Sequence, residues 1–87
     1  MLHIIKNEAG LNRAKEYAST QDAMILIQDA TYLASLSIPV SNRAMFVLHE
    51  DLQARGLGEN VLKSVQVIDF KGFVSLTEQH ESSITWD

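Results

Sequence analysis

The stretch Ala23-Met24-Ile25-Leu26-Ile27 decides the fold class of this chain. Five apolar residues follow one another without a polar interruption, which is typical of a central strand in a parallel sheet that is covered on both faces. Ala44–Leu48 is a second uninterrupted apolar run, and Leu2–Ile5 and Val65–Ile68 predict two further core strands.

Helical patterns separate these strands. One apolar helix face is predicted after the first strand by residues that recur at helical spacing, namely Leu11, Ala14, Tyr17 and Ala18. After the central strand, Gln28–Ala30 turns the chain into a short apolar helical stretch, Tyr32–Leu36, which Ile38-Pro39 closes because proline cannot continue a helix.

Two more helices follow in the second half of the chain. The first begins beside Glu50 and Asp51 and ends at Gly56, a residue suited to a left-handed helix end, where Leu57 can pack back onto the helix. Asp69 is the predicted cap of the last helix, whose apolar face is marked by Phe70, Phe73, Val74 and Thr77. Residues 83–86 predict a short extended tail.

Strands that alternate with helices at this spacing predict an α/β fold: one small domain over residues 1–87, with a mainly parallel sheet and helices on both faces. In such open sheets, ligands bind beyond the carboxyl ends of the strands. Here those ends correspond to the segments around Asn7, Gln28–Thr31, His49–Asp51 and Asp69.

Charge and hydropathy argue against nucleic-acid binding and against a membrane span. The 11 acidic and 7 basic side chains give a net charge of −4 without any basic run, so direct nucleic-acid binding is not expected. No apolar stretch approaches the roughly 20 residues needed to cross a bilayer, and Met1–Asn7 lacks a charged leader. We therefore expect a cytoplasmic protein without a membrane contact.

The chain contains no cysteine. Disulfides, thiolate metal sites and persulfide chemistry all require a side-chain sulfur that can ionise, so each is excluded for this chain.

Catalytic and cofactor motifs are also absent from the sequence. Gly10 stands alone after the first strand, which is too little for a phosphate or dinucleotide loop. The histidines His3, His49 and His80 are too far apart in sequence to form a metal-ligand pair, and no serine lies in a nucleophile elbow. The sequence therefore predicts no catalytic residue, no cofactor and no metal ligand.

One enzymatic alternative remains open. Four carboxylates are predicted at the carboxyl edge of the sheet: Asp29, Glu50, Asp51 and Asp69. They either form a magnesium-binding acidic pocket, or they cap helices and face solvent.

Several strings of the sequence resemble the DsrH/TusB family. They are Asp51–Leu57 (DLQARGL), Val67–Phe70 (VIDF), Phe73–Thr77 (FVSLT) and Ile84–Trp86 (ITW), preceded by the apolar run that leads into Gln28-Asp29. The resemblance reaches nearly the whole chain, and its most specific part runs from Asp51 to Trp86.

This resemblance implies a DsrE-like α/β subunit with a flavodoxin-like or Rossmann-like fold. Such subunits join two sister DsrE-like subunits, of the TusC and TusD type, in a hetero-oligomer that is a dimer of heterotrimers. The assembly passes persulfide sulfur toward the wobble uridine of certain tRNAs. The resemblance thus implies a non-catalytic role in a sulfur relay, exercised through cysteine-bearing sisters.

The chain departs from the family pattern at three places. Members from sulfur-oxidising organisms carry a cysteine on the first helix, and alignment back from Gln28-Asp29 puts Ala14 at that position. The family's usual glycine after the aspartate is Ala30 here, and the segment Ser37–Arg43 is short. Alanine cannot carry a persulfide.

Three residues are candidates for the subunit interface: Asp51, Arg55 and Trp86. The Arg55 guanidinium either clamps a carboxylate on a sister subunit or bonds to the carboxyl end of its own short helix. Trp86 either anchors an interface or caps the core. A free-standing regulatory module that self-associates is the alternative to the relay subunit.

Overall fold

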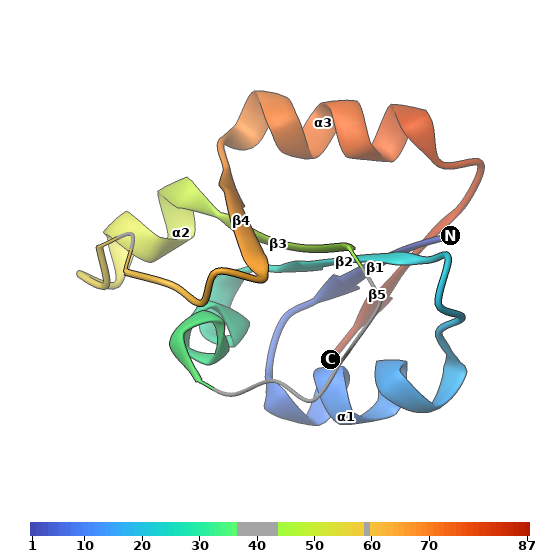
Figure 1. Cartoon of the computed structure of the whole chain (residues 1–87), viewed down its shortest axis with the longest axis horizontal. Coiled ribbons are helices and arrows are strands. Elements are labelled where there is room, and N and C mark those ends of the chain that lie inside the picture. The colour runs from blue at the N-terminus through green and yellow to red at the C-terminus, as the bar shows by residue number, and fades with distance from the viewer. Residues whose placement is uncertain (37–43, 59) are drawn as a thin grey trace.

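The computed structural model describes residues 1–36, 44–58 and 60–87. In this part of the chain five strands form one sheet in the order β4-β3-β2-β1-β5, and all neighbouring strands are parallel (Figure 1). The strands are β1 (Leu2–Ile5), β2 (Ala23–Leu26), β3 (Ala44–Leu48), β4 (Val65–Ile68) and β5 (Ser83–Trp86). The predicted α/β fold with a parallel sheet is confirmed.

The strand β2 lies at the centre of the sheet, as the unbroken apolar run predicts. All four of its residues are buried, and Ile25 pairs with Ile4 of β1 on one side and Phe46 of β3 on the other. A strand covered on both faces has no solvent side on which a polar residue would be favoured.

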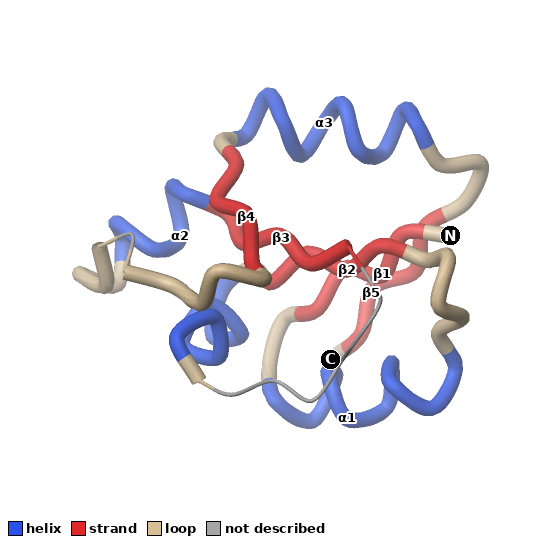
Figure 2. The backbone as a smooth tube through the Cα atoms, in the orientation of Figure 1, coloured by secondary structure: helices blue, strands red, loops and turns tan. Residues whose placement is uncertain are grey.

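Helices cover both faces of the sheet. They are α1 (Glu8–Tyr17), the 3-10 helix η1 (Gln28–Ser35), α2 (His49–Ala54) and α3 (Phe70–Gln79). In Figure 1 α3 lies on the opposite side of the sheet from α1 and η1, and Figure 2 shows the strands as one layer between them. No helix among the described residues is long and apolar enough to span a membrane.

The two faces of the sheet differ in the size of the apolar cluster that the helices bury there. On the face of α1, η1 and α2, one cluster joins the strands to Leu11, Leu33 and Leu52. On the other face Leu76 is the buried residue that α3 contributes to a smaller cluster with Leu2, Ala23 and Ile25. The α3 face is therefore the more thinly covered one.

Both helix ends that the sequence predicts are confirmed. Gly56 has φ +66°, its N–H bonds to the Gln53 carbonyl at 3.0 Å, and the Leu57 N–H bonds to the Leu52 carbonyl at 2.9 Å. This pair of bonds is a Schellman motif, and Leu57 packs against the core. Asp69 caps α3, since its Oδ1 accepts the Gly72 N–H at 2.9 Å.

The helix after β2 begins earlier than predicted. It starts at Gln28 and is a 3-10 helix, whereas the apolar pattern predicts a start at Tyr32. Gln28 takes a left-handed φ of +49°, so the chain turns directly at the end of β2, and the Ala30 N–H then bonds to the Lys6 and Ile27 carbonyls. The predictions for Ile38-Pro39 and for residues 37–43 lie outside the described residues.

Two predicted apolar faces are wrong in part. Tyr17 is exposed because it is the last residue of α1, where the ring reaches past the core toward Trp86. On α3, Phe70, Val74 and Thr77 are exposed, and Leu76 is buried with Phe73 partly covered. On α3, Gly72 lies close to the end of β4, since an added Cβ would lie 3.0 Å from Ile68 Cβ.

The predicted tail is a full strand. Residues 83–86 form β5, which pairs along its length with β1 and makes one edge of the sheet. Gly10 of α1 lies against its end, since a Cβ there would be 2.7 Å from the Trp86 carbonyl oxygen. The glycine thus permits a close approach of helix and strand.

Candidate functional site

Asp51 lies at the carboxyl edge of the sheet, in the string Asp51–Leu57 that the sequence singles out. The Asp51 Oδ2 accepts the backbone N–H of Gln28 at 2.7 Å. Gln28 holds a left-handed backbone, which is unfavourable for a side chain with a Cβ. The carboxylate of α2 therefore fixes the strained turn that follows β2.

Arg55 lies beside this turn, at the end of α2. Its Nη2 and Nε donate to Asp29 Oδ1 at 3.2 and 3.4 Å. The carboxyl end of its own helix is satisfied by backbone N–H groups, so the intramolecular partner of Arg55 is Asp29 and not the helix end predicted as one alternative. The Asp29 side chain keeps 77% of its surface exposed, so solvent screens this ion pair.

The other two edge carboxylates serve the start of α3. Glu50 Oε2 accepts the Phe70 N–H at 3.1 Å, and Asp69 Oδ1 accepts the Gly72 N–H. An open cavity of about 400 Å³ lies beside them, lined by His49, Ile68 and Asp69 among others. Each of the four predicted carboxylates thus has a partner in the chain. In the described ranges, no three His, Asp or Glu side chains are arranged so that they could hold a metal ion together.

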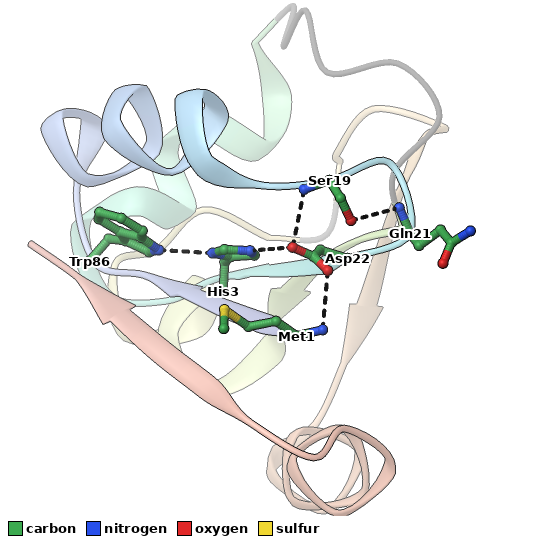
Figure 3. A network of polar contacts seen from close by, with 6 residues as sticks. All are labelled: Met1, His3, Ser19, Gln21, Asp22 and Trp86. Atoms are coloured by element: carbon green, nitrogen blue, oxygen red, sulfur yellow. Dashed lines mark hydrogen bonds and ion pairs between the residues drawn. The ribbon is translucent and has the colours of Figure 1, made fainter.

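A second polar network lies near the amino end of β1 and was not predicted. His3, 1% exposed, joins Trp86 of β5 to Asp22, which precedes β2 (Figure 3). The Trp86 Nε1–H donates to His3 Nδ1 at 2.9 Å, and His3 Nε2 lies 2.8 Å from Asp22 Oδ2. Because an indole N–H only donates, Nδ1 accepts and the ring proton is assigned to Nε2, which donates to the carboxylate.

Asp22 is the anionic end of this network. Besides His3, its Oδ2 accepts the Ser19 N–H at 3.1 Å, and its Oδ1 accepts the Met1 amine at 3.1 Å. The hydrogen bond from His3 is the main cause that lowers the pKa of the Asp22 carboxyl well below its usual range, and partial burial opposes this shift. Asp22 is therefore a carboxylate at neutral pH.

Trp86 and Tyr17 form an aromatic wall next to the network. The Trp86 and His3 rings meet through their edges, with an interplanar angle of 24° and centroids 6.1 Å apart. The contact of Trp86 with Tyr17 is tilted, with centroids 5.5 Å apart. Trp86 is partly buried against the core cluster of α1. Within the chain the tryptophan covers this end of the core, and its hydrogen bond to His3 fixes the orientation of the ring.

Ala14, which the resemblance aligns with a family cysteine, lies on the buried face of α1 and is fully buried. It packs in the same cluster as Leu11 and Leu33. The methyl group fills a core position between helix and sheet, and a reactive group there would have no access to solvent in this conformation.

The structure thus places the side chains of the predicted interface residues in two separate polar networks. Asp51 and Arg55 lie at the carboxyl edge, each bonded to the turn after β2, whereas the Trp86 side chain reaches back toward His3. The signal for the missed network was a lone histidine inside the apolar strand Leu2–Ile5, since a buried imidazole requires hydrogen-bond partners.

Comparisons with known proteins agree with the resemblance. A family profile described as DsrH like protein matches residues 6–83. Protein TusB of Pectobacterium parmentieri is 30% identical over 99% of this chain and 100% of its own length. Protein TusB of Photorhabdus laumondii is 36% identical over 87% of this chain and 79% of its own, and Protein TusB of Shigella flexneri is 36% identical over 78% of each. The chain belongs to the DsrH family.

Proposed function

We propose that this chain is a single-domain, non-catalytic subunit of a cytoplasmic sulfur relay that leads to 2-thiouridine at the wobble position of tRNA. It acts by assembly with cysteine-bearing sister subunits of the same fold, in a dimer of heterotrimers. Membership of the DsrH family and the similarity to proteins named TusB support a role in such a relay.

The observation that carries the non-catalytic part is the absence of cysteine from the 87 residues. A persulfide forms only on a thiol, so this chain cannot hold the transferred sulfur. Its contribution to the relay is therefore to bind and position a neighbour that has the thiol.

Exposed apolar side chains support assembly. Phe70 and Val74 on α3, Ile84 on β5 and Tyr17 on α1 are all exposed. Aromatic and aliphatic groups on the surface of a small domain are typical of protein interfaces. The thin cover of the sheet on the α3 side adds to this surface.

Purification of the tagged chain from the cells that encode it tests the proposal. Under gentle conditions we expect recovery of two DsrE-like sister proteins, and native mass spectrometry should give a mass that fits two copies of each subunit. In a deletion strain the fraction of thiolated wobble uridine should fall, and the wild-type gene should restore it.

Two results would reject the relay role. One is a purified chain that occurs only as a monomer or homo-oligomer, and the other is unchanged tRNA thiolation in the deletion strain. Both together would favour the free-standing regulatory module. Covalently bound sulfur on this chain itself would contradict its non-catalytic role.

A further inference from the structure

The side of α3 that faces away from the sheet is uncovered in the described part of the chain (Figure 1). Phe70 and Val74 keep 60% and 41% of their surface exposed, and Thr77 is exposed as well. These three residues are four and three positions apart, so they form an outer stripe along one side of the helix. The Thr77 hydroxyl donates to the Val74 carbonyl at 2.6 Å, which leaves its methyl group for apolar contacts.

The aromatic residue of the outer stripe is held in place. The Phe70 ring packs edge-on against Phe73, with centroids 6.3 Å apart, and Phe73 packs against the buried cluster on this face of the sheet. The Phe70 N–H is bonded to the Glu50 carboxylate of α2. A group that is already ordered loses little conformational entropy when a partner covers it.

Two opposite charges flank the outer stripe, and each lies at the less favourable end of the helix. Lys71 is in the first turn of α3, and Glu78 is in the last turn. A helix favours negative charge at its amino end and positive charge at its carboxyl end, so both side chains destabilise α3 slightly. Among the described residues, neither of them forms an ion pair within the chain.

A second copy of the same helix that runs antiparallel matches both charges. Lys71 and Glu78 are seven residues apart, so they lie on the same side of α3, about 10 Å apart along its axis. In an antiparallel pair centred near Val74, the lysine of each copy lies beside the glutamate of the other and near the negative end of the other helix dipole. A parallel pair would instead place like charges beside one another.

We infer that α3 is a self-association surface, on which a second copy of this chain packs its own α3 antiparallel. The two outer stripes are then in contact, with two Lys71–Glu78 pairs between the copies. The charges favour a second copy, because many apolar partners could cover Phe70 and Val74, whereas the reversed charge order of α3 is matched by α3 itself. The contact goes beyond the proposed function, since it is expected of the isolated chain with or without sister subunits.

Sedimentation velocity of the purified chain tests the contact. One short helix per copy makes a small interface, so we expect a monomer–dimer equilibrium with a dissociation constant of the order of 100 µM. Lys71→Glu and Glu78→Lys should each weaken the dimer at least about tenfold, because each places like charges opposite one another twice. Each change also matches the charge to the helix dipole, so weaker association cannot come from unfolding of α3.

A mixture of the two charge variants is the decisive sample. One variant has carboxylates at positions 71 and 78, and the other has ammonium groups at both. The mixture should therefore form a heterodimer at least as tight as the wild-type dimer, at concentrations where each variant alone is a monomer. Glu16→Lys, the same reversal in the last turn of α1, is the control and should change the dissociation constant less than about twofold.

A single introduced thiol locates the contact, because the chain contains no cysteine. Val74→Cys lies in the middle of α3, where the two copies are expected to meet, and should give a covalent dimer with a short bis-maleimide. Ala9→Cys, at an exposed position of α1, should not.

Three results would overturn the inference: a monomer at all accessible concentrations, wild-type association of both charge variants, or no association when they are mixed. A dimer that cross-links through Ala9→Cys and not through Val74→Cys would also overturn it. Recovery of sister subunits from cells is a separate measurement and bears on the proposed function alone.

Discussion

At the amino end of the sheet His3 is buried between an indole and a carboxylate, whereas at the carboxyl end Arg55 pairs with an Asp29 side chain that is 77% exposed. Both arrangements join residues that are far apart in sequence. In the first, removal of one partner leaves buried polar atoms without a hydrogen bond, and in the second water replaces the lost partner. The amino-end network should therefore stabilise the fold far more than the carboxyl-end ion pair.

The largest expected effect comes from His3→Ala. The change removes the hydrogen-bond partner of Trp86 Nε1 and one of the two partners of Asp22 Oδ2, and it leaves a cavity, so we expect a loss of about 3 kcal/mol in the free energy of unfolding. Urea denaturation followed by circular dichroism measures it. His80→Ala, outside the network, is the control and should cost less than about 1 kcal/mol. Equal effects of the two changes would show that the buried network adds no more stability than a histidine outside it.

Gly10→Ala should have the next largest effect. Its Cβ would meet the Trp86 backbone at 2.7 Å, and the clash outweighs the better helix propensity of alanine, for a net loss of about 1 to 2 kcal/mol. Ala9→Ser, at the exposed neighbouring position, should change stability by less than about 0.5 kcal/mol. A stabilised Gly10→Ala protein would show that α1 and β5 do not need this close approach.

An intermediate effect is expected from acid. The pKa of Asp22 is lower in the folded chain than in the unfolded chain, so its stabilising contribution is complete above the unfolded pKa of about 3.9 and is lost as the pH falls toward the folded pKa. The urea midpoint of the wild type should thus fall more steeply below pH 4 than that of Asp22→Asn. Parallel curves would mean that the carboxylate is not held by its partners.

At the carboxyl end Gln28→Gly should raise stability. Glycine adopts the left-handed conformation of residue 28 without strain, and the Asp51 hydrogen bond uses only the backbone, so we expect a gain of about 0.5 to 1 kcal/mol. Gln53→Gly, the same replacement inside α2, should instead cost about 1 kcal/mol. A loss in both variants would argue against strain at Gln28.

The smallest effect is expected from Arg55→Gln. The ion pair with Asp29 is exposed, so its removal should change the free energy of unfolding by less than about 0.5 kcal/mol. The same measurement in 0.5 M salt should show no further difference between variant and wild type. A loss above 1 kcal/mol would show that this end of the sheet depends on the pair as strongly as the amino end depends on His3.

Local sequence patterns predicted the elements of this fold because strands such as Ala23–Leu26 and caps such as Asp69 are decided by neighbouring residues. The orientation of helix faces was less predictable. Tyr17 and Phe70 have the right spacing for burial, but their positions at a helix end leave them exposed.

The candidate sites show the same limit. Asp51 and Arg55 could be singled out from the strings they belong to, but their bonds to Gln28 and Asp29 depend on how the strands are ordered. The contact of His3 with Trp86 spans 83 residues, and no periodicity reports such a pair. Only the pairing of β5 with β1 brings them together.

The order of the strands has a consequence for biosynthesis. The strand β1 has two neighbours, and β2 is made soon after it. The other neighbour, β5, is made some eighty residues later. Until the ribosome has released β5, the backbone groups of β1 on that side, the indole site of His3 and the groove beside Gly10 stay open. Because contacts of such long sequence separation tend to form late, we expect this edge of the nascent chain to stay open to other strands until β5 pairs with β1.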